Sequence, residues 1–348
     1  MDAAVKDARG LEYPFPRPPE PARITEVAEG VFWLRMPLPL ALDHINLWML
    51  AGPEGWTLVD CGMATETTRE LWRELLAGAA AKLPPKDLIV THFHPDHMGL
   101  AGWLTREFDL PVSMTETEQR TAVMFKNLDE ETFVARLADF LLPHGLAPDA
   151  MAKLASYGNA YARSVDQPPR DYRRIQDGEV LEIAGRPWRV IVGRGHAPEH
   201  AALYCEALRV LICGDLVLPE ITPNISTEWF DPESDHLADY LESLERFRAL
   251  PEDTLVLPSH RLPYRGLHTR IDQIAAHHKE RLGRVHAAAA GGAEFSAAEM
   301  LPVLFDRTLE GYQVFFALGE AIAHLDYLAN RGELSVARSP ERIRYRKV

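Results

Sequence analysis

The first part of the chain alternates apolar and polar side chains in short runs. This period of two predicts consecutive antiparallel strands, joined by tight turns, over residues 24–36, 44–50 and 56–60. A helical period follows over residues 65–81, where Thr65 or Thr67 can cap the helix, and it recurs over 237–250. The two periods together predict strands and helices mixed in one chain.

Longer helical patterns fill the middle and the end of the chain. Apolar residues at helical spacing run from about 116 to 170, where a pair of prolines ends the pattern. After Arg265 the sequence predicts, in order, a charged helix over 269–290, a capping box from Ser296 to Glu299, a helix over 312–330 and a hairpin of 334–336 with 342–345. His277 and His278 lie on the charged helix, and we expect them to be solvated.

One run of nine residues carries a high density of possible metal ligands. Residues 91–99 (THFHPDHMG) follow a β-branched apolar segment, 87–90, that predicts a buried strand. Pro95 forbids a helix through the centre of the run, so alternate residues of a loop could converge on one point. Imidazole nitrogens and carboxylate oxygens are ligands that zinc accepts. The alternative is a solvated loop, but four candidate ligands lie in six positions: His92, His94, Asp96 and His97.

This run resembles the H-x-H-x-D-H signature of the metallo-β-lactamase superfamily. That family adds an aspartate upstream and a histidine, an aspartate and a last histidine downstream, each after a strand. Here apolar runs end in the same order at Asp60, His196, Asp215 and His260. The resemblance covers roughly residues 24–270, and it implies an α+β fold, a four-layer αββα sandwich with a binuclear site at one edge.

The resemblance also implies a role for each candidate ligand. The first metal would be bound by His92, His94 and His196. The second would be bound by Asp96, His97 and His260, with Asp215 bridging the two. The implied cofactors are two divalent ions, zinc first, with iron or manganese as alternatives. A pair of ions about 3.5–4 Å apart lowers the pKa of a shared water, so a metal-bridging hydroxide would attack a carbonyl while Asp96 orients the water and passes a proton to the leaving group.

Other residues are expected to orient the ligands or to meet the substrate. Asp60 would accept a hydrogen bond from a ligand histidine and fix its tautomer. His200 could lie behind the metals, with plain packing as the equal alternative, and His44 could line the cleft. Arg261 and Tyr264 could hold an acidic substrate tail, or they could pair with surface carboxylates.

Composition narrows the range of partners. The chain has 51 acidic and 37 basic residues and a formal net charge of −14, which opposes a large nucleic-acid footprint.

The length and the apolar content bound the size of the core. The 348 residues, 47% of them hydrophobic, suffice for a substantial core plus an appendage. The 3 cysteines are too scattered for a disulfide framework, and we expect buried free thiols. Without a signal-peptide pattern or an apolar run of membrane-spanning length, we expect a cytoplasmic protein with no membrane association.

We expect three parts in this chain. Residues 1–23, rich in proline, would form an amino-terminal arm. Residues 24–267 would form the metallo-β-lactamase domain, with the helical insert at about 116–170 as a cap that selects substrates or as plain packing against the sandwich. Residues 268–348 would form a helical, winged-helix-like carboxy-terminal domain. A structural or dimerising role for this tail is favoured over DNA binding, despite its basic last strand.

The leading hypothesis is a metal-dependent hydrolase of an ester-like bond in a small acyl substrate that could be anionic: a thioester, a lactone or a related compound. The complete set of candidate ligands in this chain resembles the ligand sets of the thioesterase and lactonase branches of the family. Several β-lactamase classes instead place a cysteine among the metal ligands. The alternative is a phosphodiesterase or nuclease that uses the same binuclear site. A di-iron redox protein and a non-enzymatic binding protein carry less weight, and a homodimer stays open.

Overall fold

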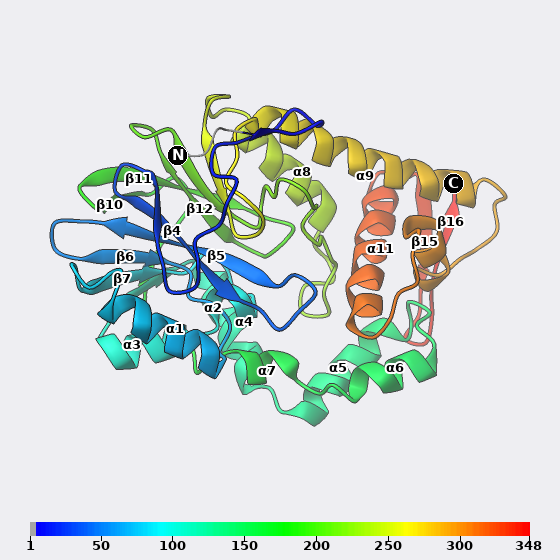
Figure 1. The fold of residues 1–348 in the computed structure, drawn as a ribbon. Helices are drawn as coiled ribbons and strands as arrows, with labels where there is room; N and C mark the ends of the chain where they lie inside the picture. The colour runs from blue at the N-terminus through cyan, green and yellow to red at the C-terminus, as the bar shows by residue number, and fades with distance from the viewer. Residues whose placement is uncertain (1–4) are drawn as a thin grey trace. The chain divides into compact units, whose positions relative to one another are not determined.

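The computed structural model describes residues 5–348, which divide into two compact units (Figure 1). The first unit contains the described residues up to 127 together with 161–223 and 244–271. The second unit contains residues 128–160, 224–243 and 272–348. Each unit therefore assembles from stretches that lie far apart in the sequence.

Two β-sheets form the centre of the first unit. The larger sheet has seven strands in the order β3 (Thr25–Ala28), β4 (Val31–Pro37), β5 (His44–Ala51), β6 (Trp56–Val59), β7 (Pro85–Ile89), β8 (Val112–Met114) and β9 (Arg173–Arg174). The smaller sheet has five in the order β10 (Val180–Ile183), β11 (Arg186–Gly193), β12 (His200–Cys205), β13 (Val210–Gly214) and β14 (Leu255–Pro258). Neighbouring strands run parallel from β6 to β9 and from β13 to β14, and antiparallel elsewhere in these sheets.

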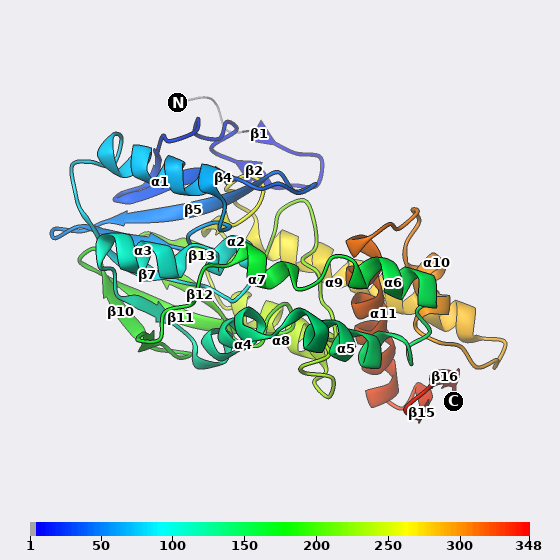
Figure 2. The same cartoon turned by 90° about the horizontal axis from the view of Figure 1, so that it is seen from below.

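Side chains from both sheets pack into one core. Trp33 and Trp48 of the larger sheet and Trp188 of the smaller one are at most 1% exposed and belong to the same buried cluster. This shared core shows that the sheets face each other, and Figures 1 and 2 show helices α1 (Glu66–Ala77) and α3 (Ala101–Phe108) lying along the larger sheet. The α+β sandwich predicted from the sequence is confirmed.

The helices of the first unit begin close to where the sequence predicts. Thr65 caps α1, because its hydroxyl oxygen accepts a hydrogen bond from the backbone nitrogen of Thr68 at 3.1 Å. The expectation for Pro95 needs correction, since a one-turn helix, α2 (Pro95–Met98), starts there. Proline is tolerated in a first turn, whose backbone N–H groups lack helical partners in any case. The remaining helices with residues in this unit are α4 (Glu116–Asn127), α7 (Ala160–Ser164), α8 (His236–Phe247) and α9 (Leu267–Ala289).

The amino-terminal segment is tied down by backbone pairing. Strand β1 (Val5–Lys6) pairs with β2 (Glu12–Tyr13), and Glu12 in turn exchanges two backbone hydrogen bonds with Arg265. Leu11 is fully buried. The predicted arm is thus partly an ordered strand pair, and its residues 1–4 lie outside the described residues.

The second unit is mainly helical and ends in a hairpin. Its elements are α5 (Glu130–Leu141), α6 (Pro148–Ala155), η1 (Ala298–Met300), α10 (Leu301–Leu304), α11 (Tyr312–Asn330), β15 (Leu334–Arg338) and β16 (Ile343–Lys347), with most of α9. The predicted hairpin forms, since β15 pairs antiparallel with β16. The predicted capping box also forms: the Ser296 nitrogen donates to Glu299 Oε2 at 2.6 Å and the Glu299 nitrogen donates to Ser296 Oγ at 3.3 Å.

The predicted helical insert at 116–170 is divided between the units. Helices α4 and α7 contribute to the first unit, whereas α5 and α6 group with the carboxy-terminal elements. Among residues 5–348, no helix combines the length and the apolar character that crossing a bilayer would need.

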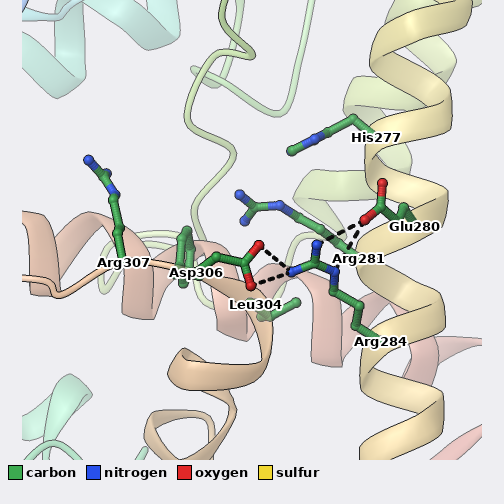
Figure 3. Close-up of a pocket in the computed structure, with 8 residues that line it drawn as sticks. His277, Glu280, Arg281, Arg284, Leu304, Asp306 and Arg307 are labelled. Carbon is green, nitrogen blue, oxygen red and sulfur yellow. Dashed lines mark hydrogen bonds and ion pairs between the residues drawn. The ribbon is translucent and has the colours of Figure 1, made fainter.

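A cavity of about 340 Å³ opens in the second unit beside α9 (Figure 3). Two of the arginines that line it, Arg281 and Arg284, are engaged by nearby acids. Arg284 donates to Asp306 Oδ2 and to Glu280 Oε1, each at 2.9 Å, and Arg281 donates to Glu320 Oε1 at 2.8 Å. Because these ion pairs join α9 to α11 and to the segment after α10, we assign them a structural role.

Two buried histidines in the second unit correct the expectation for α9. His278 and His324 are fully buried, and their Nδ1 and Nε2 atoms lie 3.2 Å apart. Burial lowers the pKa of His278 to about 2 and that of His324 to about 4, so both imidazoles are neutral. The prediction that His278 is solvated was wrong, because α11 packs against this face of α9. The charged residues near His278 in the sequence gave no sign of this packing.

We predict that acid destabilises the chain through this pair. Each imidazole is neutral when folded and takes up a proton when unfolded below about pH 6.5, so stability present above pH 6.5 is lost as the pH falls toward the lowered pKa values. Relative to the double variant His278→Leu, His324→Leu, the wild type should lose on the order of 2–4 kcal/mol of unfolding free energy between pH 7 and pH 5. Urea denaturation at each pH measures this difference, and a constant difference would contradict the prediction.

Candidate metal centre

The candidate ligands lie at the ends of strands in both sheets. The His-rich run follows β7, and His196 follows β11. Asp215 and His260 follow β13 and β14, which are parallel neighbours. Since parallel strands end at the same edge of a sheet, their following residues meet there even though the sequence separates them widely.

One group of ligand atoms is formed by His92, His94, His196 and Asp215. His94 Nδ1 lies 2.9 Å from His92 Nε2 and 3.1 Å from His196 Nε2. Asp215 Oδ2 lies 3.4 Å from His196 Nε2. Three imidazole nitrogens and a carboxylate therefore converge on one point, as a metal site of nitrogen and oxygen ligands requires.

A second group is formed by Asp96, His97 and His260. Asp96 Oδ2 lies 3.4 Å from His260 Nε2 and 3.8 Å from His97 Nε2. Asp215 reaches this group as well, because its Oδ2 lies 3.5 Å from His97 Nε2 and its Oδ1 lies 3.5 Å from His260 Nε2. The Asp215 carboxylate thus lies between the two groups.

The hydrogen bonds of the second group engage the Nδ1 atoms of its histidines and leave their Nε2 atoms facing the carboxylates. His97 Nδ1 lies 2.8 Å from Asp60 Oδ2, while the buried His97 Nε2 has no hydrogen-bond partner. His260 Nδ1 donates to the His44 carbonyl at 2.9 Å. With Nδ1 engaged in this way, each Nε2 would be the atom that faces a metal. The residues present therefore fit divalent cations by the chemistry of their ligand atoms.

Electrostatics at the two groups also fit cations. Burial and the neighbouring His196 lower the pKa of His94 to about 3, so this imidazole is neutral, as a metal ligand must be. Burial opposes the charged form of His97, yet the carboxylates of Asp60, Asp96 and Asp215 outweigh it and raise the pKa of His97 well above its usual value. The negative charges that favour a proton on this buried imidazole would also favour a metal ion beside it.

Asp60 reaches His97 from a strained backbone position at the end of β6. Its φ of 62° is in the left-handed region, which is uncommon for residues other than glycine. Oδ1 accepts from the Thr91 nitrogen at 2.7 Å, and Oδ2 accepts from the Thr91 hydroxyl at 2.9 Å in addition to the His97 ring. The carboxylate thus holds the start of the His-rich run and orients one of its imidazoles, which is the contact expected from the sequence.

His200 and His44 support the candidate ligands from outside the two groups. His200 is fully buried, stacks on the His92 ring with centroids 4.4 Å apart, and accepts a hydrogen bond from the Asp215 nitrogen at 3.1 Å. Gly214 permits this contact, because a Cβ there would lie 2.3 Å from the His200 ring. His44 Nε2 accepts from the Arg261 nitrogen at 3.0 Å. Both histidines therefore fix backbone beside candidate ligands.

Arg261 and Tyr264 lie in different surroundings. Arg261 is partly exposed, has a φ of 73°, and its Nε lies 3.5 Å from Glu220 Oε2. Tyr264 is fully buried and its hydroxyl donates to the Val217 carbonyl at 3.1 Å. The structure therefore gives Tyr264 a packing role, contrary to the expectation that it holds a substrate, because its side chain is enclosed and its hydroxyl is bonded to backbone.

Three supporting residues were missed in the sequence: Thr91, Glu118 and Tyr161. Glu118 is fully buried on α4, and its carboxylate accepts hydrogen bonds from the backbone nitrogens of Phe93 and Glu199. Burial raises the pKa of Glu118 to about 7, although these two hydrogen bonds favour the ionised form. In the sequence, Glu118 is a glutamate within a helical pattern. The periodicity of a single sequence cannot distinguish a buried glutamate on a helix from a solvent-exposed one.

The 3 cysteines are free and buried, as expected. Cys61 Sγ donates to the His97 carbonyl at 2.9 Å, and burial raises the pKa of Cys61 well above its usual value. Cys213 Sγ is held by backbone carbonyls of its own sheet. Neither thiol is among the candidate ligand groups.

Comparisons with known proteins agree with the geometry. The family model described as "Metallo-beta-lactamase superfamily" matches residues 40–260, and a second, "Metallo-beta-lactamase-like, C-terminal domain", matches residues 282–348. A solved beta-lactamase domain protein from Burkholderia ambifaria is 44% identical, with a TM-score of 0.90 over 97% of this chain and 98% of that one.

Two curated proteins are more distant relatives. The "Probable metallo-hydrolase YqjP" of Bacillus subtilis is 26% identical over 306 residues, which cover 86% of this chain and 92% of that protein. The "Acyl-coenzyme A thioesterase MBLAC2" of Bos taurus is 24% identical over 243 residues, which cover 67% of this chain and 79% of that protein.

Replacing Asp60 by asparagine tests the orientation of His97. Asparagine tolerates the left-handed backbone, but its amide nitrogen cannot accept the hydrogen bonds that one carboxylate oxygen accepts now. We expect metal affinity to fall by about 10- to 100-fold, measured by competition with a chelating indicator. Asp109→Asn is the matched control, because Asp109 is exposed and has a φ of 55°. Equal metal affinity of the Asp60→Asn variant and the wild type would refute this role.

Proposed function

Since this chain belongs to the metallo-beta-lactamase superfamily, we propose that it is a binuclear metallo-hydrolase that cleaves an ester-like bond in a small acyl substrate. The superfamily and the metallo-hydrolase relative support hydrolysis as the reaction class. A thioester, a lactone or a related acyl compound is the proposed substrate.

The position of Asp215 is the observation that carries this proposal. Its two oxygens lie 3.4–3.5 Å from imidazole nitrogens of both ligand groups. A carboxylate shared by two groups of imidazoles is suited to two cations close together rather than to one. We propose zinc as the metal, because zinc accepts imidazole nitrogen and carboxylate oxygen ligands together.

Each group of residues has a separate task in the proposed reaction. His92, His94 and His196 would hold one ion, His97 and His260 would hold the other, and Asp215 would contact both. When bound, two divalent ions lower the pKa of a water held between them and polarise a carbonyl oxygen. Asp96, whose side chain is 16% exposed, can accept a proton from water and deliver it to the leaving group.

The acyl substrate class rests on similarity and on local charge. One distant relative is named as an acyl-coenzyme A thioesterase. The partly exposed Arg261, next to His260 in the chain, offers a cation to an anionic substrate, with Glu220 as its present partner. A substrate carboxylate or phosphate would compete with that carboxylate for the guanidinium.

Phosphodiester cleavage is less well supported. Arg338 and Arg344 of the terminal hairpin, which could have met nucleic acid, form ion pairs with Asp326 at 3.0 Å and with Glu299 at 2.5 Å. With a net charge of −14 on the chain, these paired arginines offer little attraction to phosphates.

Metal removal tests the proposed hydrolase. Protein stripped with a chelator should lose hydrolysis of a panel of acyl-coenzyme A thioesters and lactones by at least about 100-fold, and zinc should restore it, because the metals supply the activated water. An Asp215→Asn variant should stay inactive after zinc is added, whereas Asp109→Asn should recover like the wild type. Equal, negligible turnover of stripped and loaded protein across the panel would overturn the proposal.

A further inference from the structure

A single buried carboxylate joins the two loops that carry the three histidines of the first ligand group. Glu118 projects from α4 and has no exposed surface. Its Oε2 accepts a hydrogen bond from the Phe93 nitrogen at 2.8 Å, and its Oε1 accepts one from the Glu199 nitrogen at 2.6 Å. Both partners are backbone groups, so the contacts fix the course of the chain rather than one side chain.

Both of these peptide groups lie beside candidate metal ligands in the sequence. Phe93 lies between His92 and His94 in the sequence, and Glu199 lies between His196 and His200. The carboxylate of Glu118 therefore spans two loops whose imidazoles must meet, although about a hundred residues separate them. His94 and His196, one from each loop, have ring nitrogens 3.1 Å apart.

Further contacts hold the same two residues from their other sides. The Tyr161 hydroxyl donates to the Phe93 carbonyl at 2.7 Å, and the Phe93 ring lies nearly parallel to that of Phe125 with centroids 5.7 Å apart. The Thr115 hydroxyl donates to the Glu199 carbonyl at 2.9 Å. Each of the two residues is thus bonded through both its N–H and its carbonyl to α4, α7 or the residue before α4.

We propose that Glu118 is a positioning residue that sets the separation of His94 and His196 and thereby the geometry of the metal site. This inference rests on the metal centre of the proposed function. It assigns a task to part of the predicted insert, since α4 and α7 brace the ligand loops.

The chemistry of the contacts requires a carboxylate. Two N–H donors need two acceptor oxygens, and a glutamine has only one, so its amide nitrogen would face a donor. An aspartate is one methylene shorter and could not reach both loops without movement of α4. Glu118→Gln is therefore nearly isosteric and removes one of the two links.

Cobalt(II) binding tests this assignment without any substrate. Cobalt absorbs visible light when bound by nitrogen and oxygen ligands, and the spectrum follows ligand geometry. We expect Glu118→Gln to bind cobalt about 10- to 100-fold more weakly than the wild type and with altered absorption bands. Gln119→Ala is the matched control, because Gln119 is a buried neighbour on α4 whose amide donates to the Pro169 carbonyl, outside both ligand loops.

The outcomes separate this inference from the proposed function. An unchanged cobalt affinity and spectrum in Glu118→Gln would overturn the positioning role alone, as would an equal loss in Gln119→Ala, which would indicate general destabilisation. Failure of the wild type to bind cobalt would overturn both proposals. If Glu118→Gln does not fold, Tyr161→Phe removes the link to the Phe93 carbonyl, and an unchanged spectrum in that variant would overturn the positioning role.

Discussion

Close approach of buried imidazoles and carboxylates is the constraint on which the structure of the candidate site depends. Nitrogens of different histidines lie about 3 Å apart, and three carboxylates, Asp60, Asp96 and Asp215, surround His97. Buried carboxylates this close together repel each other unless positive charge lies between them. Two divalent cations would supply that charge, which is the basis for the binuclear metal centre that we propose.

The fold keeps this arrangement by fixing backbone more than side chains. Asp60 bonds the first residue of the His-rich run, the His44 carbonyl orients His260, and His200 accepts from the Asp215 nitrogen. Glu118 links the His-rich run to the loop that carries His196. These supports come from residues on or next to strands of both sheets and from α4. Rigid elements of this kind hold ligands in place more accurately than loops alone would.

Much of this organisation could be predicted from the sequence. The candidate ligands could be found because they lie within a few residues after apolar runs, so that one local pattern indicates both a strand and the ligands that follow it. Helix α11 has the predicted bounds, because its apolar face is long and uninterrupted. Glu118 and the buried His278 could not be found, because burial of a polar side chain depends on contacts with distant residues. Tyr264 illustrates the same limit, since its neighbours in the sequence suggested a surface position.

Anomalous X-ray diffraction from crystals grown with zinc tests the central claim most directly. The account predicts two zinc peaks about 3.5–4 Å apart, with the Asp215 carboxylate bound to both and one ion in each ligand group. A single peak, or peaks that lie away from Asp215, would contradict it.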